Sequence, residues 1–442
     1  MHQVDDKTPS TDAEDEKPTA YAWYVAVILM LVYTLSFIDR KLPFILVQAI
    51  KKDLNLSDTQ IGLLTGIMFA LVYSTIAIPL GALADRRSRK RLIAGSIVVW
   101  SALTAAGGLA QNFVQLAGAR VGLAIGEAGF TPSAHSMIAD YFSPKYRARA
   151  MGLYFVGAQL GILLGLALGG WIADLASWRM AMFLCGIPGI FFSILILLTI
   201  REPARKLHGA EVTGAAAERP AISETFKVIF GQPTIVHLFV AGILFTFTTG
   251  AVNAFGPAYI MRTYHLTTAQ TGLTYGLLSG AAGTFGALLG GYVGDRLRKV
   301  DTSKSLLFVA CAMLLAAPFL ALALFVHSYP LFLILIFVPQ AAAMTYAGPS
   351  FSTLQSLISP RMHGMASAIF LFALSGLGAA LGPLVAGMIS DALKRAEVPD
   401  TLRWSLIILT FPMVWAAGHY LLAARALKRK QVQVAADAAA AG

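Results

Sequence analysis

Charged residues and cysteines are scarce in this chain. Only 13% of its 442 residues are charged, whereas soluble globular proteins carry about 25%. Its two cysteines, Cys185 and Cys311, fall in different apolar segments, which excludes a disulfide framework and predicts two core thiols. The sequence lacks a phosphate-binding glycine loop, and His135 has no second His or Cys at metal-ligand spacing. We therefore expect no enzyme, no cofactor and no metal, and an ion gradient as the energy source.

Apolar segments long enough to cross a bilayer recur along the chain. Apolar residues make up 57% of the sequence, and a run of about 18 or more indicates a membrane-spanning helix. Twelve such segments occur, near residues 21–48, 58–84, 92–111, 114–139, 148–172, 179–199, 232–261, 268–293, 304–327, 331–357, 364–391 and 403–424. The sequence therefore predicts an all-α, multi-pass membrane protein.

The basic residues are unevenly distributed between the predicted loops. The formal charge of +11 could indicate nucleic acid, but 22 Lys and Arg residues lie on one side of the predicted membrane against 7 on the other. The positive-inside rule then places both termini in the cytoplasm, in the plasma membrane if the source is bacterial. The first 20 residues are acidic and polar without a basic n-region, so we expect no cleavable signal peptide and no nucleic-acid partner.

Three internal echoes divide the chain into two halves. GALADRRSRK is echoed by GYVGDRLRK 210 residues later, SPKYRARAMG by SPRMHGMASA 216 later, and a glycine ladder ending at Asp174 by one ending at Asp391, 217 later. Repeated halves are typical of transporters that bind substrate at the repeat interface, although a structural repeat without transport is an alternative. The predicted parts are a disordered tail (1–20), a first six-helix bundle (21–199), a linker (200–231), a second pseudo-symmetric bundle (232–427) and a C-terminal tail (428–442).

These motifs resemble the major facilitator superfamily. GALADRRSRK resembles the loop between its second and third helices, with Ser88 in place of a glycine, and the residues that match are Gly81, Leu83, Asp85, Arg86, Arg89 and Lys90. Arg120 resembles an arginine of the fourth helix. The fifth helix of the family is glycine-rich, as here at Gly157, Gly161, Gly165 and Gly169. SFIDRKLP, RVGLAIGEAGFTPSAHSMIADYF and SPKYRARAMG are similar to Spinster-type transporters, which implies proton-linked movement of lysolipids or sphingolipid-like amphiphiles.

Four charged residues lie inside predicted spans of the first half: Asp39, Arg40, Arg120 and Glu127. Each charge at the bilayer centre costs about 2.5–3.5 kcal/mol on insertion scales. Arg120 and Glu127 are seven residues apart, on one helical face about 10 Å apart along the axis, which leaves room for the first helix between them. Asp39 and Arg40 point about 100° apart, so we expect one to face the cavity and the other the fourth helix. Because Pro43 has no N–H, the Asp39 carbonyl loses its helical donor.

We expect Asp39 and Glu127 to bind the proton or to sense the charge of the substrate, with Arg40 and Arg120 as counter-ions and Arg40 as a candidate for an anionic headgroup. A carboxylate held by an arginine changes its proton affinity when a helix shift changes its nearest partner. A static buried ion network that only fixes helix packing is the alternative.

The second half has no charged residue well inside a predicted span. The residues that we expect to line its side of the cavity are uncharged polar or aromatic: Thr249, Asn253, Tyr346, Phe255 and Phe372. This contrast suits an amphiphile whose head lies in the first half and whose tail lies against the second, at about 0.8 kcal/mol per buried CH₂. Alternatively, the aromatic residues face lipid or neighbouring helices.

Charges at helix ends are candidate conformational latches. We expect Asp85 to meet the N-terminus of the eleventh helix near Gly364, where free N–H groups favour an anion. Arg86 and Arg89 are expected to pair with Asp140. A weaker mirror latch would use Asp295 and Arg296, although many of these charges can serve only to set topology.

The sequence thus predicts a monomeric, proton-coupled secondary transporter of lipid-like amphiphiles that works by alternating access. Alternatives are a proton-coupled carrier of small organic anions or drugs and, in a different class, a lipid scramblase or a membrane-embedded enzyme.

Overall fold

The computed structural model describes residues 17–84, 86–203 and 222–441, and helices dominate all three stretches. Residues 1–16 of the predicted tail, and residues 204–221 of the predicted linker, lie outside the described part. The first half contains α1 (Ala20–Asp53), α2 (Asp58–Thr65), α3 (Ile67–Ala84), α4 (Arg89–Gly107), α5 (Phe113–Ala128), α6 (Phe130–Tyr141), α7 (Pro144–Leu175) and α8 (Trp178–Thr199).

The second half is built in the same way. It contains α9 (Ile222–Phe230), α10 (Pro233–Tyr264), α11 (Thr268–Val300), α12 (Thr302–Ala323), α13 (Tyr329–Thr345), α14 (Ala347–Leu357), the 3₁₀ turn η2 (Pro360–Met362), α15 (His363–Phe372), the π-helical η3 (Ala373–Ala379), α16 (Ala380–Arg395), α17 (Thr401–Ile408) and α18 (Phe411–Ala441). The short helix α9 falls in the predicted linker, and α18 continues through most of the predicted C-terminal tail.

Each of the twelve predicted spans corresponds to a straight or broken helix of the described chain. Ten are long and apolar enough to cross a membrane, and α4 with the broken pair α5–α6 completes the set. The second span breaks at Gly66, whose backbone is irregular, and the fourth at Gly129, three residues before Pro132, which has no N–H to donate to the Ala128 carbonyl. These breaks place polar residues next to interrupted helical hydrogen bonds.

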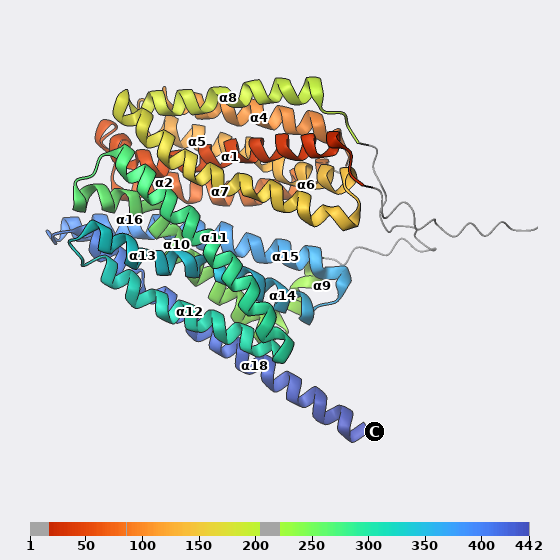
Figure 1. The fold of residues 1–442 in the computed structure, drawn as a ribbon. Coiled ribbons are helices and arrows are strands. Elements are labelled where there is room, and N and C mark those ends of the chain that lie inside the picture. Colours follow the sequence, from red (N-terminus) through yellow and green to blue (C-terminus); the bar gives the residue numbers. More distant parts are fainter. Residues whose placement is uncertain (1–16, 85, 204–221, 442) are drawn as a thin grey trace, which may run out of the picture.

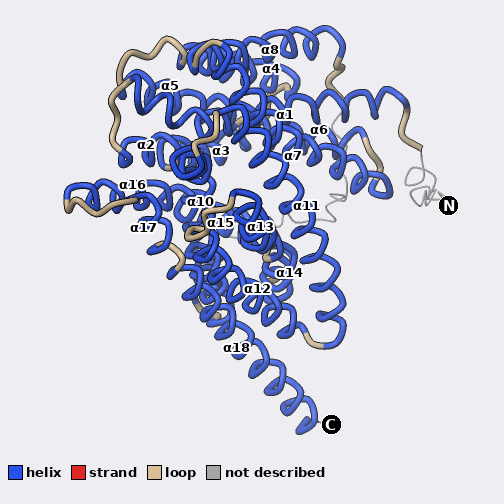
Figure 2. The backbone as a smooth tube through the Cα atoms, turned by 60° about the vertical axis from the view of Figure 1, so that its left-hand side comes forward, coloured by secondary structure: helices blue, strands red, loops and turns tan. Residues whose placement is uncertain are grey.

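The helices form two groups that lie side by side, α1–α8 in one and α10–α18 in the other (Figures 1 and 2). Within the first group, the glycine stripe of α7 packs on α1: a Cβ at Gly161 would lie 2.5 Å from the Thr34 carbonyl oxygen. In the second group Gly382 approaches α10 in the same way, 1.9 Å from the Phe247 carbonyl oxygen. These stripes therefore bring helices together within each half.

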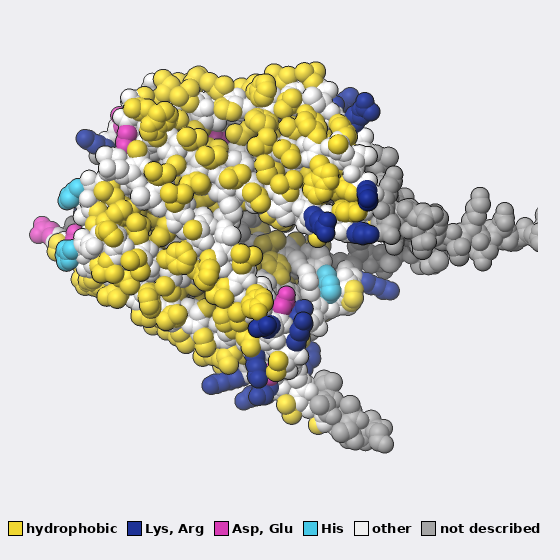
Figure 3. Space-filling model, viewed as in Figure 1, with side chains coloured by type: hydrophobic (Ala, Val, Ile, Leu, Met, Phe, Trp, Pro, Cys, Tyr) yellow, Lys and Arg dark blue, Asp and Glu magenta, His cyan; other side chains and the backbone are white. Residues whose placement is uncertain are grey.

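The interface between the halves is tight at one end and loose at the other. We call the end where α1 begins and α18 ends the terminal end, and the opposite one the far end (Figure 1). Near the far end, a Cβ on Gly272 of α11 would lie 2.1 Å from the Leu166 carbonyl oxygen of α7. Moving toward the terminal end, a Cβ on Gly276 would lie 3.3 Å from the Leu163 carbonyl oxygen. A Cβ on Gly283 would lie 3.7 Å from the side-chain oxygen of Gln159. The halves therefore diverge toward the terminal end, where the surface is hollowed between them (Figure 3).

One of the two cysteine predictions is wrong. Cys185 on α8 is buried, but Cys311 on α12 is exposed on the outer surface of the bundle. An apolar helix facing lipid accepts a thiol as readily as a core does, so composition alone does not separate the two positions.

Candidate functional site

Three helices of the first half bring the predicted charged residues together. Asp39 and Arg40 lie on α1 just before Pro43, and Arg120 and Glu127 lie one above the other on α5. α3 supplies Phe69 to the same site, where its ring centroid is 5.1 Å from each of the two guanidinium carbons. Phe69 therefore contributes a favourable cation–π contact to each of the two cations.

Arg40 and Glu127 form an ion pair inside the membrane-spanning part of the bundle. The Arg40 Nε donates to the Glu127 Oε2 at 2.5 Å, and the Ser36 hydroxyl donates to the same oxygen at 3.0 Å. The guanidinium also lies 4.4 Å from the ring centroid of Tyr73. Within the described chain, the second oxygen, Oε1, is buried and has no hydrogen-bond partner. Glu127 therefore has one oxygen held by Arg40 and one free to take a proton.

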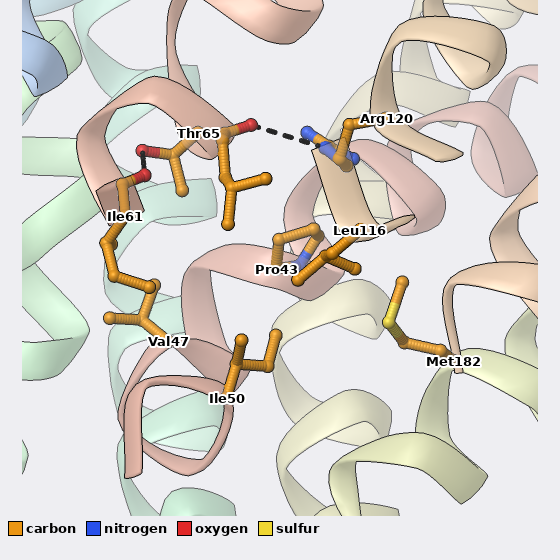
Figure 4. A pocket seen from close by; sticks show the side chains of 9 residues that line it. Pro43, Val47, Ile50, Ile61, Thr65, Leu116, Arg120 and Met182 are labelled. Carbon is orange, nitrogen blue, oxygen red and sulfur yellow. Dashed lines mark hydrogen bonds between the residues drawn. The ribbon is translucent and has the colours of Figure 1, made fainter. Parts of the chain in front are cut away.

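Arg120 contacts backbone carbonyls rather than a carboxylate. It donates from Nη1 to the Asp39 carbonyl oxygen at 3.3 Å and from Nε to the Leu64 carbonyl oxygen at 3.4 Å. The first contact fills the acceptor that Pro43 leaves open, as the sequence predicts. A pocket of only about 10 Å³, lined mostly by apolar residues such as Met182, lies beside it (Figure 4). That volume holds about one water, so no substrate reaches Arg120 from this side.

Burial separates Arg40 from the other three residues of the cluster. Asp39 and Arg120 are each 2% exposed and Glu127 is 0% exposed, whereas the Arg40 side chain is 17% exposed. Arg40 is thus the member that pairs with the fourth span and keeps part of its side chain exposed, while its Nη2 is buried without a hydrogen-bond partner among the described residues. The sequence left open which of Asp39 and Arg40 faces the cavity; the Asp39 carboxyl is buried within the first half, where Oδ1 has no hydrogen-bond partner among the described residues.

The cavity lining predicted for the second half is weakly polar. Four of the five predicted lining residues are half-buried: Thr249, Asn253, Tyr346 and Phe372. Phe255 is 0% exposed and belongs to the core of the second half, so its placement in the cavity lining is wrong. Periodicity alone does not distinguish the two faces of a helix that is apolar all round.

The predicted latch residues that the structure describes lie at the terminal end, at or beside the ends of α4, α6 and α11. Asp85 lies outside the described residues. Arg89 donates to Asp140 and, at 3.0 Å, to Glu202, which joins α4, α6 and the segment after α8 within one half. Burial alone would raise the pKa of Glu202, but hydrogen bonds from Ser88 and from the backbone and side chain of Arg89 outweigh it and lower this pKa. Arg86 is exposed on the adjoining turn and, among described residues, is not the partner of Asp140.

The expected mirror latch is not formed in this conformation. Asp295 is exposed and lies 3.8 Å from Arg298 on the same helix, while Arg296 lies over the ring of Tyr292, also on α11. The halves diverge here, so each charge takes its partner from its own helix.

Hydrogen bonds between the halves lie at the far end, and two of these contacts follow the internal repeat. Asp391 of α16 accepts hydrogen bonds from the first two N–H groups of α2, on Asp58 at 3.1 Å and on Thr59 at 2.8 Å. Asp174 of α7 accepts from the first two N–H groups of α11 at 3.2 and 2.7 Å. We call these two contacts the far-end clasps. The sequence signal was present, because Asp174 and Asp391 end the two echoed glycine ladders.

Asp58 adds a third contact between the halves. It pairs with Lys51 of its own half and, at 3.1 Å, with Arg262 of α10, whose Nε also donates to Gln48 of α1 at 3.1 Å. A pocket of about 290 Å³ lies beside these residues, between the two halves. The far end is therefore closed by ionic contacts around a small polar recess.

Lys41 is a further charged residue of the site that the sequence reasoning overlooked. It lies on α1 beside Arg40, is half-buried, and its ammonium is 4.7 Å from the ring centroid of Phe44. The sequence could have revealed it, because Lys41 is a charged residue inside the first predicted span.

Comparison with known proteins shows the family to which this chain belongs. The family model of the Major Facilitator Superfamily matches residues 29–383. The chain belongs to the Major Facilitator Superfamily. A relative from Mycolicibacterium smegmatis named an MFS-type efflux pump is 34% identical over 94% of this chain and 96% of its own. Mouse protein spinster homolog 1 is 26% identical over 88% of this chain and 78% of its own.

Solved structures agree with this assignment. The crystal structure of a bacterial homolog of the human lysosomal transporter Spinster, in an inward-facing and unoccupied conformation, matches with a TM-score of 0.83 and 28% identity, over 93% of this chain and 99% of that one. A D-xylose–proton symporter shares the fold, with a TM-score of 0.67 and 19% identity over 91% of this chain and 97% of its own. This superfamily member is therefore an integral, multi-pass transporter of the Spinster type for small molecules, and not an enzyme.

Proposed function

We propose that this superfamily member is a proton-coupled secondary transporter that moves lipid-like amphiphiles by alternating access. The excess of basic residues at the terminal end supports a cytoplasmic position for that end, in a plasma membrane. The open wedge then faces the cytoplasm, and the far-end clasps close the external side. The chain works as a monomer in this proposal, because each half supplies the closing partner of the other.

The Arg40–Glu127 pair is the observation that carries the coupling. A proton on Glu127 removes the charge that holds the Arg40 guanidinium at 2.5 Å, and Arg40 is the cluster member with an exposed edge. The released cation is then free to turn toward the opening or toward a substrate headgroup. Loss of the proton restores the pair and pulls α1 back against α5. Proton binding and substrate binding thereby act on one side chain.

The contrast between the halves supports an amphiphilic substrate. Charged groups are confined to the first half, while the facing surface of the second half offers half-buried Tyr346 and Phe372. A buried acyl chain gains about 0.8 kcal/mol per CH₂ against such a surface. An anionic headgroup beside Arg40 would pair with the guanidinium that protonated Glu127 no longer holds.

Export of small organic anions or drugs is a second candidate function. The 34% identical relative is named an efflux pump, and the half-buried Lys41 adds positive charge beside Arg40. Both candidates use the same proton step, so they differ only in whether the second half binds a hydrocarbon chain.

Transport in proteoliposomes with an imposed proton gradient tests the coupling. We expect Glu127→Gln to abolish gradient-driven accumulation while substrate exchange without a gradient continues, because glutamine cannot change its charge. Asp39→Asn tests the buried carboxyl in the same way. Proton-dependent accumulation retained by both variants contradicts the proposed coupling, and wild-type equilibration that ignores the gradient indicates a scramblase.

A further inference from the structure

One positive charge in the middle of the membrane-spanning region has no counter-ion in the described part of the chain. Lys41 lies 12 residues before the end of α1 at Asp53, about 18 Å below the far end of that helix. Phe44 is its recorded cation–π partner, and no described carboxylate lies within ion-pair distance of its ammonium. A charge at this depth normally faces a partner or a watery cavity.

The position of Lys41 on α1 points toward the second half. Gln48 lies seven residues later on the same helical face, and its side chain accepts the hydrogen bond from Arg262 of α10. The stem of Lys41 passes α7, since a Cβ on Gly165 would lie 3.3 Å from the Lys41 Cβ. Lys41 therefore lies near the line where the two halves meet, level with Gly165, which directly precedes the Leu166 carbonyl that contacts Gly272 of the second half.

The remaining charges of the site balance each other. Glu127 offsets Arg40 in a direct ion pair, and Arg120 donates to the backbone of Asp39, whose carboxyl carries the second negative charge. With every group ionised, the cluster of Asp39, Arg40, Arg120 and Glu127 has no net charge, and Lys41 leaves one positive charge over.

We propose that Lys41 is the headgroup-binding residue of this transporter and that its substrate carries a net negative charge on a carboxylate, phosphate or sulfonate. The inference rests on the proposed function and narrows it, because a zwitterionic head would leave the site with its surplus charge. An anionic head brings the occupied site to neutrality, which lowers the cost of carrying it through the low-dielectric intermediate. This balance applies to the state in which Glu127 is ionised, because protonation of Glu127 would leave Arg40 as a second unpaired cation.

Binding to the full chain in nanodiscs tests this assignment with three probes. Oleoyl lysophosphatidylglycerol is anionic, oleoyl lysophosphatidylcholine has the same acyl chain with a zwitterionic head, and octanoate is a short carboxylate. Hydrogen bonds to charged groups predict that Lys41→Met binds the anionic lysolipid about tenfold to hundredfold more weakly. The zwitterionic lysolipid should change less than about twofold, and Lys41→Arg should retain the preference for the anion. Lys52→Met, an exposed lysine at the far end of the same helix, is the matched control and should bind all probes like the wild type.

Each outcome decides the proposal. Equal weakening of both lysolipids by Lys41→Met, or no weakening of either, overturns the headgroup role, as does an Lys41→Arg variant as weak as Lys41→Met. If neither lysolipid binds the wild type but octanoate binds through Lys41, the lysolipid class of substrate in the proposed function is wrong and the anion site stands. If none of the three binds, both proposals are contradicted.

Discussion

Removing the charge of the far-end clasps should shift the transporter toward a state in which the far end is open. Asp391 and Asp174 each place a carboxylate on the N-terminal N–H groups of a helix from the other half. An asparagine keeps one side-chain oxygen acceptor but loses the charge and the second oxygen. We therefore expect Asp391→Asn and Asp174→Asn to weaken closure of the far end while leaving both helices intact.

The magnitude follows from the two parts of each contact. A negative charge at a helix N-terminus contributes about 0.3–1 kcal/mol, and up to about 2 kcal/mol when partly buried. A hydrogen bond to a charged group contributes about 1.5–3 kcal/mol, part of which the asparagine retains. We expect a net loss of about 1–2 kcal/mol per site, which is roughly a fivefold to thirtyfold change in the inward/outward ratio. Because the two clasps hold different helices, the double variant should lose roughly the sum.

Spin-label distances measure this ratio directly. Labels at Gln111→Cys and His327→Cys, both exposed at the far end and in different halves, should report a longer-distance population that grows in each variant. The background replaces Cys185 and Cys311 with serine. A second pair at the terminal end, Ala148→Cys and Lys299→Cys, should show the complementary shortening.

Asp53→Asn is the matched control, because Asp53 pairs with Arg179 at the same end but within the first half. It should leave both distance distributions unchanged. Unchanged distributions in the double clasp variant would refute the reasoning, since the far end would then be held shut by packing alone. A shift as large in Asp53→Asn would show that any lost charge at this end has the same effect.

Three further results are expected. Gly272→Ala should open the far end more than Gly276→Ala does, because its new Cβ would lie 2.1 Å rather than 3.3 Å from the nearest carbonyl oxygen, and the same labels measure this. Glu202→Gln should reduce the free energy of unfolding by about 0.5–1 kcal/mol, the value of a partly exposed ion pair, and should therefore lower the melting temperature slightly. The hydrogen bonds from Ser88 and its neighbours lower the folded-state pKa of Glu202, so this contribution is complete above the ordinary carboxyl pKa and lost as pH falls through the lowered value; thermal scans from pH 7 to pH 3 should show wild type and variant converge. A protonophore should abolish substrate accumulation but not exchange, and equal loss of both would contradict a coupled carrier.

Most of the fold could be predicted from the length of the apolar segments in the sequence. Membrane spans are recognisable because every backbone group must be satisfied within its own helix, which leaves long apolar runs as the only solution. The breaks at Gly66 and Gly129 were less accessible, because a glycine in an apolar run is also compatible with close helix packing. Cys311 and Phe255 failed for a related reason, since apolar residues face lipid and core alike.

The residues of the site could be predicted where burying a charge in the membrane is energetically unfavourable. Buried charge is rare in a membrane, so Asp39, Arg40, Arg120 and Glu127 stand out from the sequence, and the structure brings them together. Their orientation was not predictable, because a 100° turn between Asp39 and Arg40 does not say which of them faces the opening. The far-end clasps required knowing that a carboxylate in one half meets a helix start in the other, which only the assembled bundle shows.

The symmetry of the gate and the asymmetry of the charges together indicate how a proton could move the halves. The clasps are repeated in both halves, so neither half alone controls closure of the far end. The ion cluster occurs once, on α1 and α5, and α1 packs along the glycine stripe of α7, where Gly161 and Gly165 allow backbone contact. α7 ends in Asp174, which holds the start of α11. A change in the Arg40–Glu127 pair therefore has a continuous packed path through α1 and α7 to one clasp, and the second clasp follows because both halves turn about the same interface.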